Sequence, residues 1–261
     1  MSNDLYNHPY YYDLAFGWDQ AEEISGLEKI WTRHFPGEVQ SILEPACGSG
    51  RFLINLARRG YKVMGFDINP HMLQFSREQV KKAGLEDRVE IMEGDMVDFR
   101  APQKSEVAVN LINSFSYLLD WQSIVKHLNS MASCLKPSGL YIIQISFRHN
   151  SEELPVSQTW TQAREGVVVT TTWEVQSEDP RENIARHRCR MEIKTGDQEG
   201  LLEEEHVMRS WTYPDFQELI RENEMWDLKA IYDADFQEVG KNITLEGTCG
   251  NLYLILARNS N

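Results

Sequence analysis

Between residues 44 and 50 the sequence reads Glu44-Pro45-Ala46-Cys47-Gly48-Ser49-Gly50, and this stretch decides the predicted fold. It follows an apolar run at 41–44 that predicts a short strand, and it precedes residues 51–57, whose apolar spacing predicts a helix. The two glycines allow a sharp turn and a close approach of the backbone to a ligand. The first turn of the helix offers unpaired N–H groups. The stretch therefore predicts a ligand-binding turn between a strand and a helix.

Two common glycine-rich motifs do not fit this turn. The dinucleotide fingerprint needs a third glycine where Leu53 stands. A P-loop needs a lysine directly after its last glycine, and Arg51 stands there instead. The turn therefore belongs to another kind of nucleotide or cofactor site.

Short apolar runs continue to alternate with helical patterns through the first half of the chain. Further strands are predicted at residues 62–66, 89–92, 107–111 and 140–145, helices at 69–83 and 124–135, and a turn at 136–139. This alternation is typical of parallel strands joined by crossover helices on both faces of a sheet. The sequence therefore predicts an α/β, Rossmann-like core.

The pattern changes after about residue 150. β-branched residues without helical spacing predict extended chain at 167–173, 184–195 and 201–209, whereas a helix at 213–223 and strands at 228–231 and 252–256 resume the earlier pattern. We therefore divide the chain into a core, residues 1–149 and 210–261, and a small antiparallel β insertion, residues 150–209, that follows the fifth strand and covers the substrate.

Charge narrows the range of partners. The chain has 40 acidic and 26 basic residues and a net charge of −14, and residues 151–261 alone carry 22 acidic against 11 basic side chains. Affinity for nucleic acid depends largely on neutralisation of phosphates by Lys and Arg, so no nucleic-acid partner is expected. A small-molecule partner fits better.

Membrane and metal sites are not predicted either. No apolar run approaches the roughly 18–20 residues of a membrane span, and the first residues lack the features of a secretory signal. The four cysteines lie far apart, without metal-ligand spacing. We expect a cytoplasmic protein with reduced thiols.

Acidic residues follow the next two strands. Asp67 ends the run at 62–66, where a carboxylate can accept hydrogen bonds from ribose hydroxyls, and Gly94-Asp95-Met96 follows the run at 89–92. A carboxylate and an apolar side chain at that point can hold an adenine ring and its amino group. All three elements fall at the carboxyl ends of successive parallel strands, where ligands bind to such sheets.

Together, residues 44–50, 65–68, 94–96 and 135–139 resemble the class I S-adenosylmethionine-dependent methyltransferases. Tyr11-Tyr12-Asp13 and the insertion are similar to small-molecule members of the glycine and amino-sugar N-methyltransferase type. The resemblance implies S-adenosylmethionine as cofactor and a seven-stranded, mostly parallel sheet whose last strand is antiparallel. It also implies in-line transfer of a methyl group to a nitrogen or oxygen of a small-molecule acceptor.

The resemblance also implies roles for individual residues. The glycine turn would approach the methionine part, Asp67 the ribose, and Tyr12 would form part of a lid. Candidates for orienting the acceptor or taking its proton are Tyr12, Tyr117 and His206, although amino-sugar enzymes often have a histidine where Tyr117 stands. The implied cofactor-binding residues are Tyr12, Glu44, Ala46, Gly48, Gly50, Asp67, Ile68, Asp95, Met96, Leu111, Asn113 and Phe115.

Two alternatives remain open at this point. A nicotinamide-dependent Rossmann oxidoreductase shares the strand, glycine turn and helix, and a non-catalytic module could bind adenosyl ligands without turnover. In every case the extended insertion offers strand edges that could pair in a homodimer.

Overall fold

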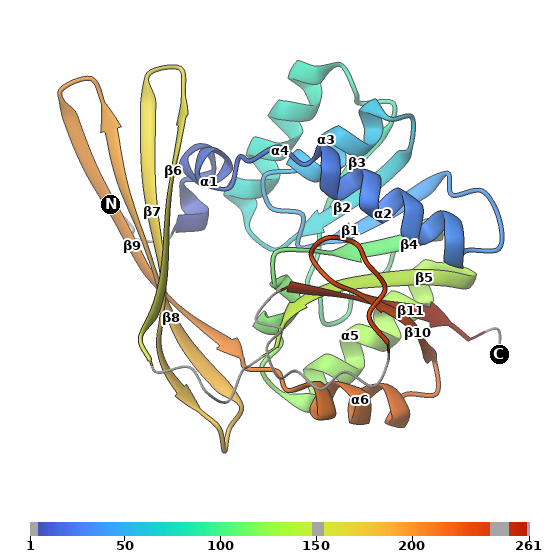
Figure 1. Cartoon of the computed structure of the whole chain (residues 1–261). Coiled ribbons are helices and arrows are strands. Elements are labelled where there is room, and N and C mark those ends of the chain that lie inside the picture. Colours follow the sequence, from blue (N-terminus) through green and yellow to red (C-terminus); the bar gives the residue numbers. More distant parts are fainter. Residues whose placement is uncertain (1–4, 148–153, 241–250, 260–261) are drawn as a thin grey trace.

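The computed structural model describes residues 5–147, 154–240 and 251–259, and these form two sheets (Figure 1). The larger is seven-stranded, in the order β10-β11-β5-β4-β1-β2-β3, and β11 runs antiparallel to both of its neighbours. The predicted Rossmann-like sheet is thereby confirmed. Its strands are β1 (Ser41–Pro45), β2 (Lys62–Asp67), β3 (Val89–Glu93), β4 (Ser105–Asn110), β5 (Leu135–Ser146), β10 (Trp226–Tyr232) and β11 (Asn251–Arg258).

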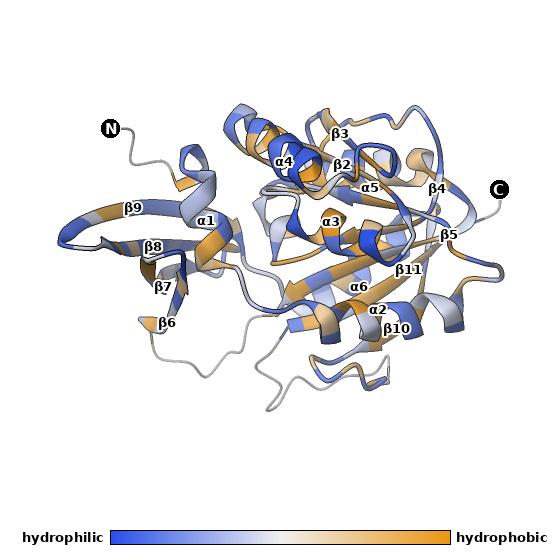
Figure 2. Cartoon of the chain, turned by 90° about the horizontal axis from the view of Figure 1, so that it is seen from above, coloured by the Kyte–Doolittle hydropathy of each residue, from blue (hydrophilic) through white to orange (hydrophobic). Residues whose placement is uncertain are grey.

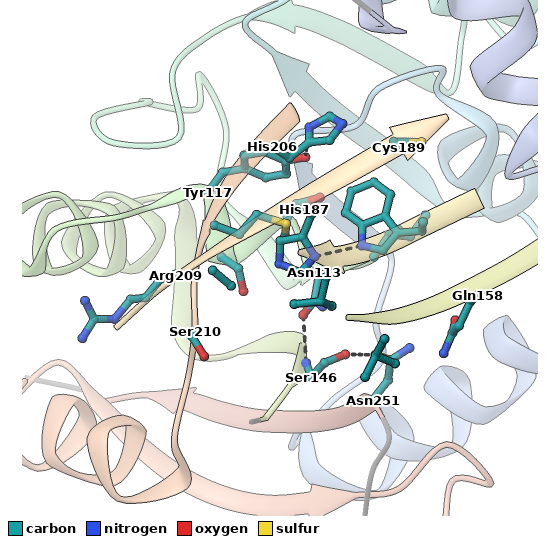
Figure 3. A pocket seen from close by; sticks show the side chains of 18 of the residues that line it. Asn113, Tyr117, Ser146, Gln158, His187, Cys189, His206, Arg209, Ser210 and Asn251 are labelled. Carbon is teal, nitrogen blue, oxygen red and sulfur yellow. Dashed lines mark hydrogen bonds between the residues drawn. The ribbon is translucent and has the colours of Figure 1, made fainter. Parts of the chain in front are cut away.

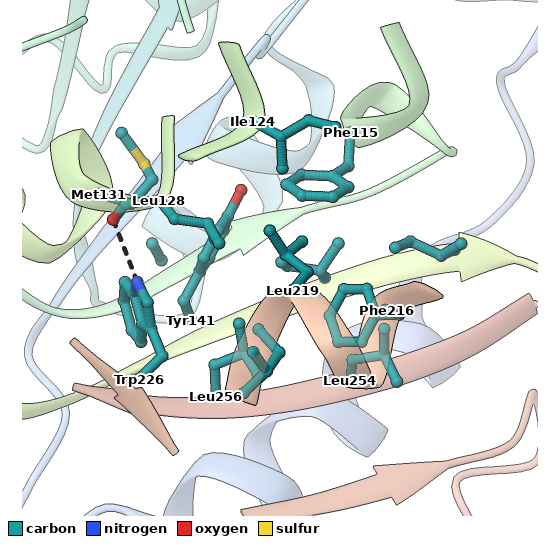
Figure 4. Packing of buried hydrophobic residues seen from close by; sticks show 14 of the residues in the cluster. Phe115, Ile124, Leu128, Met131, Tyr141, Phe216, Leu219, Trp226, Leu254 and Leu256 are labelled. Carbon is teal, nitrogen blue, oxygen red and sulfur yellow. Dashed lines mark hydrogen bonds between the residues drawn. The ribbon is translucent and has the colours of Figure 1, made fainter. Parts of the chain in front are cut away.

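Helices cover both faces of this sheet because successive strand residues point to opposite sides. Along β5, Tyr141 and Ile143 pack beneath α5 (Trp121–Cys134) and α6 (Tyr213–Glu222), as Figure 4 shows in part. Leu140 and Ile142 pack on the opposite side, with residues of α2 (Ala21–His34), α3 (Arg51–Arg58) and α4 (Pro70–Ala83). In Figure 2 the central strands are accordingly largely orange, the colour of hydrophobic residues.

Local signals set the helix boundaries as predicted. The Asn69 side chain caps α4 by accepting hydrogen bonds from the backbone N–H groups of His71 and Met72. Gly84 ends this helix in the left-handed conformation. At α6, the Thr212 hydroxyl accepts from the Asp215 N–H. Each signal depends only on neighbouring residues, and for that reason the sequence alone locates it.

The second sheet is four-stranded and antiparallel, in the order β6-β7-β8-β9. It confirms the antiparallel insertion, although β6, the short helix α1 (Pro9–Ala15) and α2 were not expected. α1 packs on one end of this sheet, where Leu14 and Phe16 meet Val169, Met191 and Leu202 in an apolar cluster. Its strands are β6 (Val156–Arg164), β7 (Val167–Asp179), β8 (Ile184–Thr195) and β9 (Gln198–Arg209).

The expected turn at 136–139 is instead a bulge within β5. Leu135 pairs with Ser105 and Leu140 with Val107, so four residues of β5 lie opposite one residue of β4. Ser138, inside the bulge, has φ 60°. The Pro-Ser-Gly sequence thus interrupts the ladder without reversing the chain.

None of the helices within residues 5–147, 154–240 and 251–259 has the length and apolar character needed to cross a membrane.

The fully buried His127 on α5 links this helix to the sheet. Its Nδ1 lies 2.8 Å from the Met96 carbonyl oxygen and must donate to it, so Nε2 accepts from the Tyr141 hydroxyl at 2.7 Å. Burial lowers the pKa of His127 to about 4. The imidazole therefore stays neutral in the folded protein at pH values where it is already protonated in the unfolded chain.

We expect this histidine to make the fold acid-sensitive. Since the unfolded chain binds more protons below about pH 6.5, the free energy of unfolding should fall on acidification, His127 contributing about 2 kcal/mol between pH 7.5 and 5. Urea denaturation of the wild type and of His127→Gln at both pH values measures this contribution. Equal acid-induced losses in the two proteins would contradict it.

Candidate active site

The turn between β1 and α3 is held in an unusual backbone conformation. Ala46, Gly48 and Gly50 have φ values of 55°, 52° and 74°. A Cβ at Gly50 would lie 2.8 Å from the Cβ of Ser76, so the turn requires glycine there for space as well as for φ. A Cβ at Gly48 would instead meet only the Tyr12 ring, at 3.9 Å. The chain thus leaves room between this turn and Tyr12.

Asp67, at the end of β2, fastens the turn to the next helix. Its Oδ2 accepts from the Gly48 N–H at 2.8 Å, and its Oδ1 accepts from the Asn69 N–H at 2.9 Å. Burial raises the pKa of Asp67, and these two N–H groups oppose that rise. The carboxylate therefore organises the same edge at which it would meet a ribose.

Three other predicted cofactor residues lie along this edge. Ile68 is 66% exposed, and Asp95 is exposed, with Oδ1 accepting from the Val97 N–H. Met96 is partly buried, and its sulfur lies 3.8 Å from Nδ2 of Asn110 at the end of β4. Because the Ile68 and Asp95 side chains are exposed, a ligand at this edge can contact them without any rearrangement of the core.

The surroundings of Glu44 show whether a ligand with an amino-acid moiety fits beside the glycine turn. It is buried at the end of β1, and among the residues that the structure describes its Oε2 has no hydrogen-bond partner. Burial raises the pKa of Glu44 well above its ordinary value, and Arg51 opposes this. A buried oxygen of this kind is costly unless a donor satisfies it. The ammonium of a bound methionine moiety is such a donor, so the residues present fit S-adenosylmethionine.

A cavity of about 480 Å³ lies between the two sheets (Figure 3). One wall is the inner face of the second sheet, where alternate residues of each strand point the same way. Cross-strand pairing places Val156, Val175, His187 and His206 in one row of this face. The facing wall includes Asn113, Tyr117, Ser146 and Asn251.

Aromatic side chains join the two walls. The Tyr117 hydroxyl, from the short helix η2 (Ser114–Tyr117), is 2.9 Å from Nδ1 of His206 on β9. It is also 2.8 Å from the Tyr6 hydroxyl in the turn η1 (Leu5–Asn7). The His206 ring stacks on Trp173, with the ring centroids 5.0 Å apart. Three segments distant in sequence thus form one hydrogen-bonded chain at the cavity.

Tyr12 lies between the cavity and the glycine turn. It lines the cavity, and its ring lies beside Gly48. Burial raises the pKa of Tyr12 and of Tyr117, so both phenols stay protonated at neutral pH. The predicted catalytic candidates Tyr12, Tyr117 and His206 all line this one cavity. Asn113 lines it as well, and its Oδ1 accepts a hydrogen bond from the Ser146 N–H.

Two predicted cofactor residues require correction. The Leu111 carbonyl already accepts hydrogen bonds from both the backbone N–H and the hydroxyl of Ser114, which occupy its two lone pairs. Phe115 is fully buried and stacks on Trp211, with centroids 5.4 Å apart, instead of lining the cavity. Leu111 and Phe115 were expected to contact the cofactor because they lie at or just after the end of β4. The 3-10 helix η2, however, directs the Phe115 side chain into the core.

Tyr6, His187 and Glu178 are among the cavity residues that the sequence analysis missed. Tyr6 stands close to Tyr10, Tyr11 and Tyr12, and this tyrosine cluster was the available signal. His187 accepts from the Trp173 indole N–H at 3.0 Å, and burial lowers its pKa to about 4. Glu178 lines the cavity near the end of β7 and accepts from the Ser210 hydroxyl.

Comparison with known proteins finds a methyltransferase domain that includes the glycine turn and the strand ends next to it. Residues 42–139 match the model of a methyltransferase domain family. A Streptomyces venezuelae enzyme, dTDP-3-amino-3,4,6-trideoxy-alpha-D-glucopyranose N,N-dimethyltransferase, is 28% identical over 141 residues, which are 53% of this chain and 56% of that protein. The dTDP-3-amino-3,6-dideoxy-alpha-D-glucopyranose N,N-dimethyltransferase of Streptomyces fradiae is 27% identical over 51% of each chain. The chain thus spans about half the length of these curated relatives.

The fold is shared over nearly the whole chain. An S-adenosylmethionine-dependent methyltransferase from Clostridium acetobutylicum superposes with a TM-score of 0.78 at 17% identity, covering 98% of this chain and 100% of that one. An S-adenosylmethionine-bound amino pentose methyltransferase from Micromonospora echinaspora gives 0.73 at 15% identity, covering 98% and 97%. Residues 42–139 thus match a methyltransferase domain, and the chain shares the fold of these S-adenosylmethionine-dependent methyltransferases over nearly its whole length.

Proposed function

We propose that this chain is an enzyme that transfers a methyl group from S-adenosylmethionine to a nitrogen of a small-molecule acceptor bound between the two sheets. The observation that carries the proposal is the position of Tyr12, which borders both the acceptor cavity and the glycine turn. A donor at the turn and an acceptor in the cavity would therefore meet beside this ring.

A nitrogen acceptor is favoured over oxygen by the charges at the cavity. Glu178 lines it, and Glu204 on β9 is close enough to raise the pKa values of Tyr6 and Tyr117, after the larger effect of burial on each. The Arg209 guanidinium points away from the labelled cavity residues in Figure 3 and donates to the Leu119 carbonyl. Carboxylates and aromatic rings attract an ammonium group. The two curated relatives described above are N,N-dimethyltransferases.

When bound, S-adenosylmethionine supplies a methyl group whose bonding electrons pass to the sulfur as the acceptor attacks in line. Holding the two reactants aligned can contribute roughly 7–11 kcal/mol to lowering the barrier. The Tyr117 oxygen accepts a proton from the acceptor nitrogen as its own proton passes to Nδ1 of His206. Tyr6 fixes the orientation of the Tyr117 hydroxyl.

The division of the chain follows from this arrangement. Residues 1–149 and 210–261 would bind the cofactor, whereas the insertion at 150–209 would cover the acceptor. The insertion supplies Trp173, His187 and His206 to the cavity wall. A homodimer through its strand edges remains a prediction.

Ligand-induced stabilisation tests the proposed function. S-adenosylhomocysteine at 100 times its dissociation constant should add about 2.7 kcal/mol to the free energy of unfolding, or roughly 5–10 °C in melting temperature. NAD should have no effect. Stabilisation by NAD alone would support the oxidoreductase alternative instead.

Turnover is tested with methyl-labelled S-adenosylmethionine and a metabolite extract. Label should enter a small amine. Cofactor binding without label transfer to any extracted compound would favour the non-catalytic alternative.

A further inference from the structure

Two side chains of opposite charge, the buried Glu44 and the half-buried Arg51, flank the glycine turn. Within the described residues, Oε2 of Glu44 and Nε of Arg51 are both buried without a hydrogen-bond partner. Glu44 precedes the turn on β1, and Arg51 follows Gly50 as the first residue of α3. Unsatisfied buried charged groups are costly, so native proteins rarely keep them without a purpose.

The surroundings of Arg51 hold its guanidinium near this turn. Its Nη1 donates to the Asp13 carbonyl at 3.1 Å, and Asp13 directly follows Tyr12 on α1. Its guanidinium carbon lies 5.9 Å from the centroid of the Trp18 ring. Burial lowers the pKa of Arg51, and neighbouring acidic groups, including Asp13 and Glu44, oppose this. Arginine nevertheless stays charged in proteins.

The methionine part of S-adenosylmethionine carries the complementary pair of charges. Its ammonium needs an acceptor and its carboxylate needs donors, and the turn offers one unsatisfied atom of each kind. Guanidinium groups match carboxylates in charge and geometry. We propose that Arg51 binds the carboxylate of the methionine moiety, opposite Glu44, which receives the ammonium; this assignment rests on the proposed function.

A purely structural role is the rival explanation, since Arg51 also ties α1 to α3 through the Asp13 carbonyl. The two roles differ in what they predict for ligands. A residue that binds the carboxylate distinguishes ligands with and without that group. A residue that only supports the turn affects both ligands equally.

The experiment is calorimetric titration with two ligands, S-adenosylhomocysteine and its decarboxylated analogue, which keeps the ammonium and the adenosine. The wild type should bind S-adenosylhomocysteine at least about tenfold more tightly than the analogue, the scale of one charge-assisted hydrogen bond. Arg51→Gln should lose this preference while its affinity for the analogue stays within about twofold, and Arg51→Lys should restore part of it. Arg58→Gln, an exposed position on the same helix, is the matched control.

Three results would overturn the assignment. The first is an equal loss of affinity for both ligands in Arg51→Gln, and the second is an unchanged affinity of that variant for S-adenosylhomocysteine. The third is a wild type that binds both ligands with equal affinity. The last comparison needs no variant, so it can overturn the assignment even if Arg51→Gln fails to fold. If neither ligand binds the wild type, the proposed function itself is wrong.

Discussion

Replacing Phe115 with alanine is expected to lower the free energy of unfolding by about 3–5 kcal/mol, the usual cost of deleting a buried aromatic ring. The side chain is fully buried, and its ring packs against Trp211, Phe216 and His127. Figure 4 shows it among the apolar side chains beneath α5. Urea denaturation measures the loss.

The same variant tests the correction made for this residue. Because Phe115 belongs to the core, folded Phe115→Ala should bind S-adenosylhomocysteine within about twofold of the wild type. Phe115→Leu, which fills more of the space, should lose clearly less stability. Weakened binding together with nearly unchanged stability would place Phe115 at the cofactor after all.

Asp67→Ala should weaken binding of S-adenosylhomocysteine by about 3 kcal/mol, or roughly 150-fold. The variant removes the expected contacts to the ribose, and it also deprives the Gly48 and Asn69 N–H groups of their acceptor. For the second reason the free energy of unfolding should also fall, by about 1–2 kcal/mol. Calorimetry measures the first effect and denaturation the second.

Asp98→Ala is the matched control for this substitution. Asp98 is an exposed aspartate on the loop after β3, and its replacement should change neither quantity appreciably. If Asp67→Ala binds S-adenosylhomocysteine as well as the control does, Asp67 has no part in the cofactor site.

The sequence suffices to predict the cofactor-binding edge of the sheet, at the carboxyl ends of β1, β2 and β3, because the signals for it are local. Glycines at 48 and 50 mark the turn, and Asn69 and Gly84 mark the two ends of α4. Asp67 comes at the end of a strand, and the ends of parallel strands meet at one edge whatever the details of packing. The alternation of short apolar runs with helical patterns along the chain also predicts the parallel sheet and its helical layers.

The tyrosine cluster near the N-terminus could have drawn attention to Tyr6, but the hydrogen-bond partners of Tyr6 could not be assigned from the sequence because they are distant. Its hydroxyl meets Tyr117, 111 positions away in the chain, and Tyr117 meets His206, a further 89 positions on. Nothing in the local pattern around any of these residues indicates that they share a hydrogen-bonded chain. Docking of the second sheet and of η1 against the core decides it.

The sequence by itself determined the alternation of strands and helices, the glycine turn, the carboxylates at the strand ends and the antiparallel character of the insertion, since each depends on a short pattern of neighbouring residues. Only the tertiary structure decided that Phe115 enters the core and that the Leu111 carbonyl already accepts two hydrogen bonds. It also decided that, within the described residues, one buried atom each of Glu44 and Arg51 lacks a hydrogen-bond partner. The physical reason is that burial and hydrogen-bond satisfaction belong to a packed arrangement of distant segments. A pattern of neighbours does not specify which of its polar atoms will find a partner once those segments meet.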